Sequence, residues 1–151
     1  MKKLLFLSVA LFFAITLSVL AQKEPKVSEK AKTSFAKAFP AAADVKWQKE
    51  NKDYEVEFKL NGVETSVVIN AQGKILETES AIEKTALPKG VEEFITKNHQ
   101  GWQITETAKI IDDKNVITFE AQISKGKSKK DLLFDSAGKP ILKKENGKEK
   151  D

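Results

Sequence analysis

The sequence predicts an α+β fold that consists of two α-β-β-β-β repeats, with both helices packed on one face of an antiparallel sheet. Residues 68–76 recur as residues 133–141, and both segments run from two apolar residues through Asn or Asp to a Gly-Lys pair. The alternating residues 54–58 recur as 119–123 at the same separation of 65 residues. A helical run precedes each copy, and the short hairpin turns within a copy require antiparallel neighbours. This internal repetition predicts a duplicated structural unit.

The first repeat is predicted to span residues 28–80. Its helix covers 28–39, because apolar residues recur there with the period of one helical face. Ser28 suits the N-cap, and Pro40 disfavours helix in the residue before it. Alternation of apolar and polar residues then predicts four short strands, which cover residues 44–50, 53–60, 63–70 and 74–80.

The second repeat is predicted to span residues 88–144, after a linker at 81–87. Pro88 suits the first position of a helix over 88–99, and Gly101 follows its end. The strands expected after this helix cover residues 102–111, 115–124, 128–135 and 139–144. The tail 145–151 has no apolar side chain, which predicts disorder.

The N-terminus has the organisation of a secretory signal peptide. Two lysines precede an uncharged, largely apolar run at residues 4–21, which ends in Val19-Leu20-Ala21. We expect cleavage between Ala21 and Gln22, a short linker at 22–27, and export to the periplasm or beyond the cell. An uncleaved anchor is the alternative, because the run approaches the roughly 20 apolar residues that span a bilayer.

The composition excludes several kinds of chemistry. The chain has no cysteine, which excludes disulfides, thiol nucleophiles and thiolate zinc sites. All 26 basic residues are lysines, and the lack of arginine argues against sequence-specific DNA recognition. Removing residues 1–21 leaves 24 lysines and 22 acidic residues, a net charge of +2. We therefore expect no nucleic-acid partner, and contact with a membrane only through the transient signal peptide.

Residues 35–50 resemble the opening of the PepSY-like family of bacterial envelope proteins. The shared motifs, in order, are Phe39-Pro40, Val45-Lys46-Trp47, the strand 54–58, Asn61-Gly62 and Gly73-Lys74. The second repeat resembles the same unit, so the match covers about residues 28–143, although Asn98-His99 departs from an aromatic-Pro pair. The resemblance implies the α-β4 repeat fold of a secreted β-lactamase inhibitor protein (BLIP), without catalytic residues.

Few residues are candidates for catalysis or metal binding. His99 is the only histidine and is expected in the last turn of a helix, where a cation is favourable. A hydrolase that depends on His99 would need a nucleophile that no motif supplies. Asp112, Asp113 and Asp135 lie in turns and lack the spacing of a calcium loop, so hairpin chemistry explains them. We therefore predict no enzyme activity, no cofactor and no metal site.

Lysines and aromatic residues offer two further candidate surfaces. A lysine-rich hairpin could contact anionic lipid or polysaccharide at the cell envelope, or could simply protect a sheet edge; its lysines are Lys125, Lys127, Lys129 and Lys130. Four aromatic residues could anchor an interface, but their strand positions favour the core; they are Trp47, Tyr54, Trp102 and Phe119.

The leading hypothesis is a binding module that recognises a protein or peptide, with an inhibitory or regulatory role. If the helices cover one face of the sheet, the polar residues of the alternating strands line the other. The predicted protein-binding residues are Glu55, Glu57, Lys59, Glu120, Gln122 and Ser124. A solvated surface is the alternative for each of them.

Overall fold

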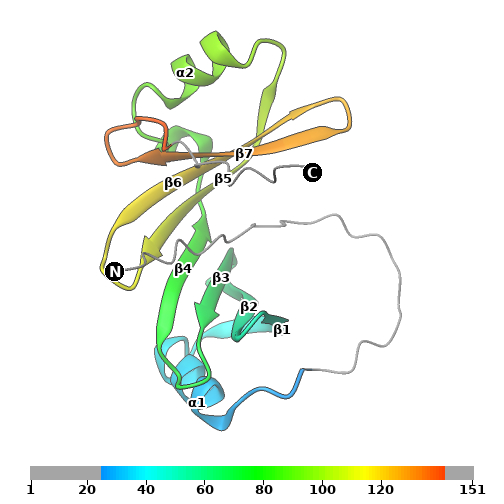
Figure 1. Cartoon of the computed structure of the whole chain (residues 1–151), viewed down its shortest axis with the longest axis vertical. Coiled ribbons are helices and arrows are strands. Elements are labelled where there is room, and N and C mark those ends of the chain that lie inside the picture. Colours follow the sequence, from blue (N-terminus) through cyan, green and yellow to red (C-terminus); the bar gives the residue numbers. More distant parts are fainter. Residues whose placement is uncertain (1–24, 142–151) are drawn as a thin grey trace, which may run out of the picture.

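The computed structural model describes residues 25–141, and the predicted signal peptide, its cleavage site at Ala21-Gln22 and the tail 145–151 lie outside this range. The described chain forms two α-helices, seven strands and one short 3-10 helix (Figure 1). In chain order these are α1 (Glu29–Ala38), β1 (Ala42–Glu50), β2 (Asp53–Leu60), β3 (Val63–Ile69), β4 (Ile75–Ala81), η1 (Lys84–Ala86), α2 (Val91–Asn98), β5 (Gln103–Asp112), β6 (Ile117–Lys125) and β7 (Ser128–Asp135).

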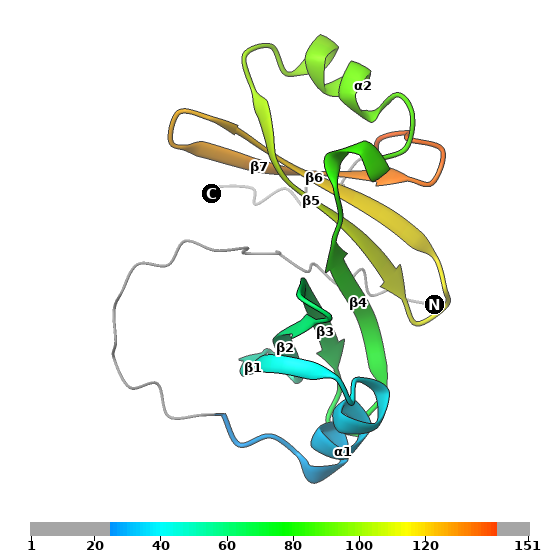
Figure 2. The same ribbon diagram turned by 180° about the vertical axis from the view of Figure 1, so that it is seen from behind.

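All seven strands belong to one antiparallel sheet, in which they follow each other in sequence order. The pairing of β4 with β5 joins the two halves, and it places Glu79 opposite Ile110 and Ala81 opposite Ala108. Figure 2 shows β4 running between the strands near α1 and the strands near α2. The predicted α+β class and the continuous antiparallel sheet are therefore confirmed.

The predicted eighth strand at 139–144 is not formed by the described residues. Within 139–141, Pro140 makes a single bridge to Phe134, and the N–H of Ile141 donates to the Leu133 carbonyl at 2.7 Å. Proline has no N–H to donate, so it cannot continue a ladder of backbone hydrogen bonds. Residues 142–144 lie outside the described range.

Both helices cover the same face of the sheet. The α1 side chains pack in a core cluster with Val56 and Phe58 of β2, and the α2 side chains pack with Ala121 and Phe134. The strand register connects the two clusters, because Phe58 reaches Phe119 through directly paired residues of β3, β4 and β5. Side chains that alternate with these point to the other face, which neither helix covers and which we call the open face.

The two helices begin in different ways. At α1 the Ser28 hydroxyl accepts a hydrogen bond from the Ala31 N–H at 3.1 Å, as an N-cap does, and the helix ends before Pro40. The prediction that α2 begins at Pro88 is wrong. Gly90 precedes Val91 with φ of +93°, a left-handed conformation that cannot belong to the helix, so α2 begins only at Val91.

The repeated Gly-Lys motif brings a turn of the sheet against α1 in the first half and against Pro88 and Lys89, just before α2, in the second. The side chains of Asn70 and Asp135 each accept two backbone N–H groups of their own turn, at 2.9–3.0 Å. Gly73, in the first of these turns, lies so close to α1 that a Cβ on it would be 2.7 Å from the Lys30 carbonyl oxygen. Only glycine permits this approach together with φ of +84°.

Candidate functional site

The open face brings together all six residues that the sequence proposes for protein binding. On β2, Glu55, Glu57 and Lys59 alternate with the core residues. On β6, Glu120 and Gln122 alternate with Ala121 and Ile123, which contact α2. Ser124 continues the same row on β6. The continuous register places both sets on one surface, so the two halves could contact one partner together.

Two of the six are not solvated, in contrast to the alternative that the sequence suggests for them. Glu120 and Gln122 are each only 5% exposed, because β5 and β7 flank their strand on both sides. The Gln122 side-chain amide donates to the Asp131 carboxylate at 3.3 Å. The other four residues are half-buried.

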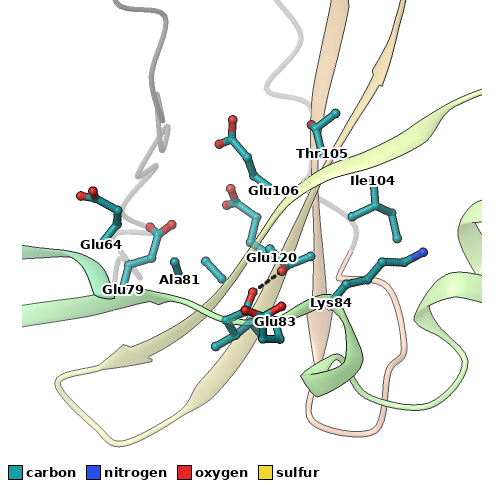
Figure 3. A pocket seen from close by; sticks show the side chains of 12 residues that line it. Glu64, Glu79, Ala81, Glu83, Lys84, Ile104, Thr105, Glu106 and Glu120 are labelled. Carbon is teal, nitrogen blue, oxygen red and sulfur yellow. Dashed lines mark hydrogen bonds between the residues drawn. The ribbon is translucent and has the colours of Figure 1, made fainter. Parts of the chain in front are cut away.

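The open face contains a hollow of about 420 Å³ where β4, β5 and β6 meet (Figure 3). Its floor contains the paired residues Ala81 and Ala108, whose short side chains leave space between longer neighbours. The hydroxyl of Thr107 donates to the Ile82 carbonyl at 2.6 Å beside this floor. Five glutamates line the hollow, namely Glu64, Glu79, Glu83, Glu106 and Glu120.

Glu79 is the most perturbed of these acids. Its side chain is 3% exposed, and its Oε1 has no hydrogen-bond partner. Burial, followed by the negative charge of Glu120, raises the pKa of Glu79 to about 8. On the same face, burial and the charge of Glu50 raise the pKa of Glu55 to about 7. At neutral pH the Glu79 carboxyl is therefore mostly protonated and the Glu55 carboxyl is about half protonated.

Cations lie at the margins of this acidic surface. Lys59 forms ion pairs with Asp44 at 3.3 Å and with Glu64 at 3.7 Å, and Lys129 contacts Glu106 at 3.6 Å. The lysine that lines the hollow, Lys84, instead pairs with Glu92 of α2 at 3.2 Å. Among residues 25–141 no lysine forms an ion pair with the buried Glu79 carboxylate, although four other acids line the same hollow.

Sequence analysis missed Glu64, Glu79 and Glu106. Glu77 and Glu79 alternate in the predicted strand 74–80, which is a signal that they share a face. Their proximity to Glu106 and Glu120 depends on the pairing of β4 with β5 across the two halves, which no local pattern specifies.

The residues considered for catalysis or metal binding have structural roles. His99 is the C-cap of α2, as expected, and its ring lies 6.1 Å from Phe94 and 6.5 Å from Trp102. Asp112 accepts the N–H groups of Lys114 and Val116 at 2.9 and 2.8 Å, which is ordinary hairpin chemistry. Among residues 25–141, no group of three or more acidic or histidine side chains is arranged to hold a metal ion.

The lysine-rich hairpin does not form one cationic surface. Lys129 faces the open side, where it pairs with Glu106, whereas the Lys130 ammonium lies 4.7 Å from the centre of the Trp102 ring. Lys125 donates to the Gln100 carbonyl at 3.2 Å. The four aromatic candidates belong to the cores: Tyr54 is buried, and Trp47, Trp102 and Phe119 pack partly buried against the two clusters.

Comparison with solved structures shows the fold. A DUF2874 family protein from Bacteroides uniformis aligns with a TM-score of 0.68 and 18% identity, over 77% of this chain and 87% of its own. A BLIP-like protein from Bacteroides fragilis aligns with a TM-score of 0.63 and 21% identity, over 84% and 93%. A protein from Bacteroides eggerthii, predicted to be periplasmic, aligns with a TM-score of 0.69 and 16% identity, over 78% of this chain and 88% of its own. These similarities establish a BLIP-like fold.

Other comparisons add no assignment. No family model matches the chain, so the PepSY-like resemblance remains a prediction, and no curated protein matches it. Within residues 25–141 neither helix has the length and apolar character needed to cross a membrane.

Proposed function

We propose that this protein is an exported, non-enzymatic binding module of the PepSY-like type, which recognises a protein or peptide through its open face. The observation that carries the proposal is the hollow in this face, where the buried Glu79 lacks a partner for Oε1. A buried acceptor without a partner costs free energy in the isolated protein. A bound partner that donates to it would recover this loss, which is the pattern expected of a recognition surface.

The floor of the open face supports the same function. Val68, Ala108 and Ile110 point away from the two helix-covered cores and are nonetheless at most 9% exposed. Apolar floor residues surrounded by polar groups are typical of protein interfaces, whose centres are apolar and whose rims are polar. Binding of this kind would inhibit or regulate the bound protein.

The proposal includes the duplication and the location of the protein. The same pattern of turn hydrogen bonds occurs in both halves, centred on Asn70 in one and Asp135 in the other, which supports two copies of one unit. The signal sequence and the B. eggerthii neighbour predicted to be periplasmic support a place in the periplasm or outside the cell.

Site-specific photo-crosslinking in the bacterial envelope tests the proposed surface. A photoreactive amino acid replaces Gln48 or Ser124 on the open face and, as matched controls, Lys37 or Lys97 on the exposed surface of the helices. We expect both open-face positions to crosslink to the same protein and the helix positions to give no such product. Crosslinks from the helix positions alone, or none from the open face, would refute the proposal.

A further inference from the structure

The hollow combines apolar and acidic chemistry in one place. Ala81 and Ala108 form its floor, and Ile82 and Ile104 add further apolar surface. In Figure 3 the carboxylates of Glu64, Glu79, Glu106 and Glu120 project to the same side of the strands. A ligand that fits must therefore present both an aliphatic part and a positively charged group.

Two acceptors in this region have no partner within the described chain. They are Oε1 of Glu79, whose side chain is almost fully buried, and Oε2 of Glu106, whose other oxygen contacts Lys129. Lys84 also lines the hollow, but its ammonium pairs with Glu92 instead. The unused acceptors are separated along the strands, because Glu79 pairs with Ile110, four residues from Glu106 on β5.

We propose that the hollow binds the side chain of an arginine that the partner protein presents, an inference that rests on the proposed function. The aliphatic stem would lie on the two alanines, and the guanidinium would donate to the Glu79 carboxylate, near the negative charge of Glu120. Arginine carries five N–H donors in a planar fork and is less strongly hydrated than lysine, so it suits several carboxylates in a buried site. The volume of about 420 Å³ falls in the range of side-chain and small-ligand sites, roughly 300–1,000 Å³.

Selectivity for arginine would also prevent the hollow from binding the lysines of other copies of this protein. All 26 basic residues of the chain are lysines. A site that accepted any ammonium group would be open to lysines of neighbouring copies, whereas preference for a planar guanidinium excludes them.

Methyl NMR with blocked pentapeptides tests the inference on the mature protein. The peptides differ only at the central residue, which is arginine, lysine or citrulline, the last a neutral isostere of arginine. Because the pKa of Glu79 is about 8, the titration is run at pH 9 and low ionic strength. We expect the arginine peptide to shift the methyl signals of Ala81 and Ala108, and not that of Ala31, a residue of α1 that is buried in the first core cluster.

The comparison between peptides and between variants decides the outcome. We expect the citrulline and lysine peptides to bind at least tenfold more weakly than the arginine peptide. The double variant Glu79→Gln/Glu106→Gln should lose at least tenfold in affinity, whereas the control Glu29→Gln/Glu93→Gln, on exposed helix positions, should not change it. Equal binding of citrulline or lysine, or an unchanged affinity of the first variant, would overturn the inference.

The same data separate this inference from the proposed function. If the arginine peptide does not bind but Gln48 and Ser124 still crosslink to a protein, the inference alone is wrong. If the crosslinks are absent as well, the open face is not a docking surface and both proposals are wrong.

Discussion

Replacing Glu79 by glutamine should change the pH dependence of stability in a direction opposite to that of an ordinary surface carboxylate. The pKa of Glu79 rises from 4.5 to about 8 on folding, because burial and the charge of Glu120 disfavour the ionised form. The folded protein therefore holds this proton more tightly than the unfolded chain does. The contribution of Glu79 to the unfolding free energy is therefore complete below pH 4.5. It is lost as the pH rises to about 8, where the carboxyl ionises in the folded protein as well.

The magnitude follows from the pKa values. One pKa unit corresponds to about 1.4 kcal/mol, so a rise from 4.5 to about 8 is equivalent to about 5 kcal/mol. Relaxation of the hollow and entry of water would reduce this loss, and we expect about 2 to 4 kcal/mol between pH 5 and pH 9. Glutamine has nearly the same shape and no charge, so Glu79→Gln should become more stable than the wild type by this amount at pH 9.

Urea unfolding followed by tryptophan fluorescence measures the effect. Trp47 and Trp102 each pack against one of the two core clusters, so they report on both halves of the sheet. The quantity to compare is the difference in unfolding free energy between Glu79→Gln and wild type at pH 5, 7 and 9. The exposed control Glu29→Gln should show no such trend. A difference that is constant with pH, or that decreases as the pH rises, would contradict the reasoning.

The remaining predictions concern a turn glycine and the pH dependence of binding. Gly73→Ala should lower the free energy of chemical unfolding by about 3 kcal/mol, because a Cβ would meet the Lys30 carbonyl. The control Gly62→Ala has the same φ of +84° and open space around it, so it should cost only about 1 kcal/mol. Equal losses in the two variants would contradict the close contact at Gly73. The affinity for the arginine peptide should rise at least tenfold from pH 6 to pH 8 in calorimetry, since binding requires ionised Glu79, and it should rise much less in Glu79→Gln. The charged groups around this site that contribute to the profile are Glu55, Lys59, Glu64, Glu77, Glu83, Lys84, Glu106, Glu120, Lys129 and Asp131.

Local patterns predicted most of the fold, because helix and strand periods are properties of short segments. The strands expected at 53–60 and 128–135 have these bounds in the structure. The errors arose where one residue's backbone controls the outcome. Gly90 adopts a positive φ and delays the start of α2 beyond Pro88, and Pro140 limits the expected last strand to a bridge within the described residues.

The candidate site was predictable only in part. The face to which a side chain points follows from alternation within one strand, whereas the hollow depends on how distant strands pair. Alternation placed Glu57 and Gln122 on the same side, and the structure agrees. Burial of Glu120 requires strands on both sides of it, and the position of Glu79 near it requires β4 to pair with β5. The space itself results from Ala81 facing Ala108, two residues far apart in the sequence whose significance emerges only from their pairing.

The effects of Glu79→Gln on stability and on arginine binding together show whether Glu79 serves the fold or a binding site. If this carboxylate served the fold, its replacement by glutamine would lower stability, because a buried group that serves the fold has partners to lose. Its Oε1 has none, and its ionisation is unfavourable in the isolated protein. Above pH 8 we therefore expect Glu79→Gln to stabilise the free protein and at the same time to weaken its binding of arginine. An acid that opposes folding and favours binding supports a role of the hollow in recognition, since neither core cluster uses it.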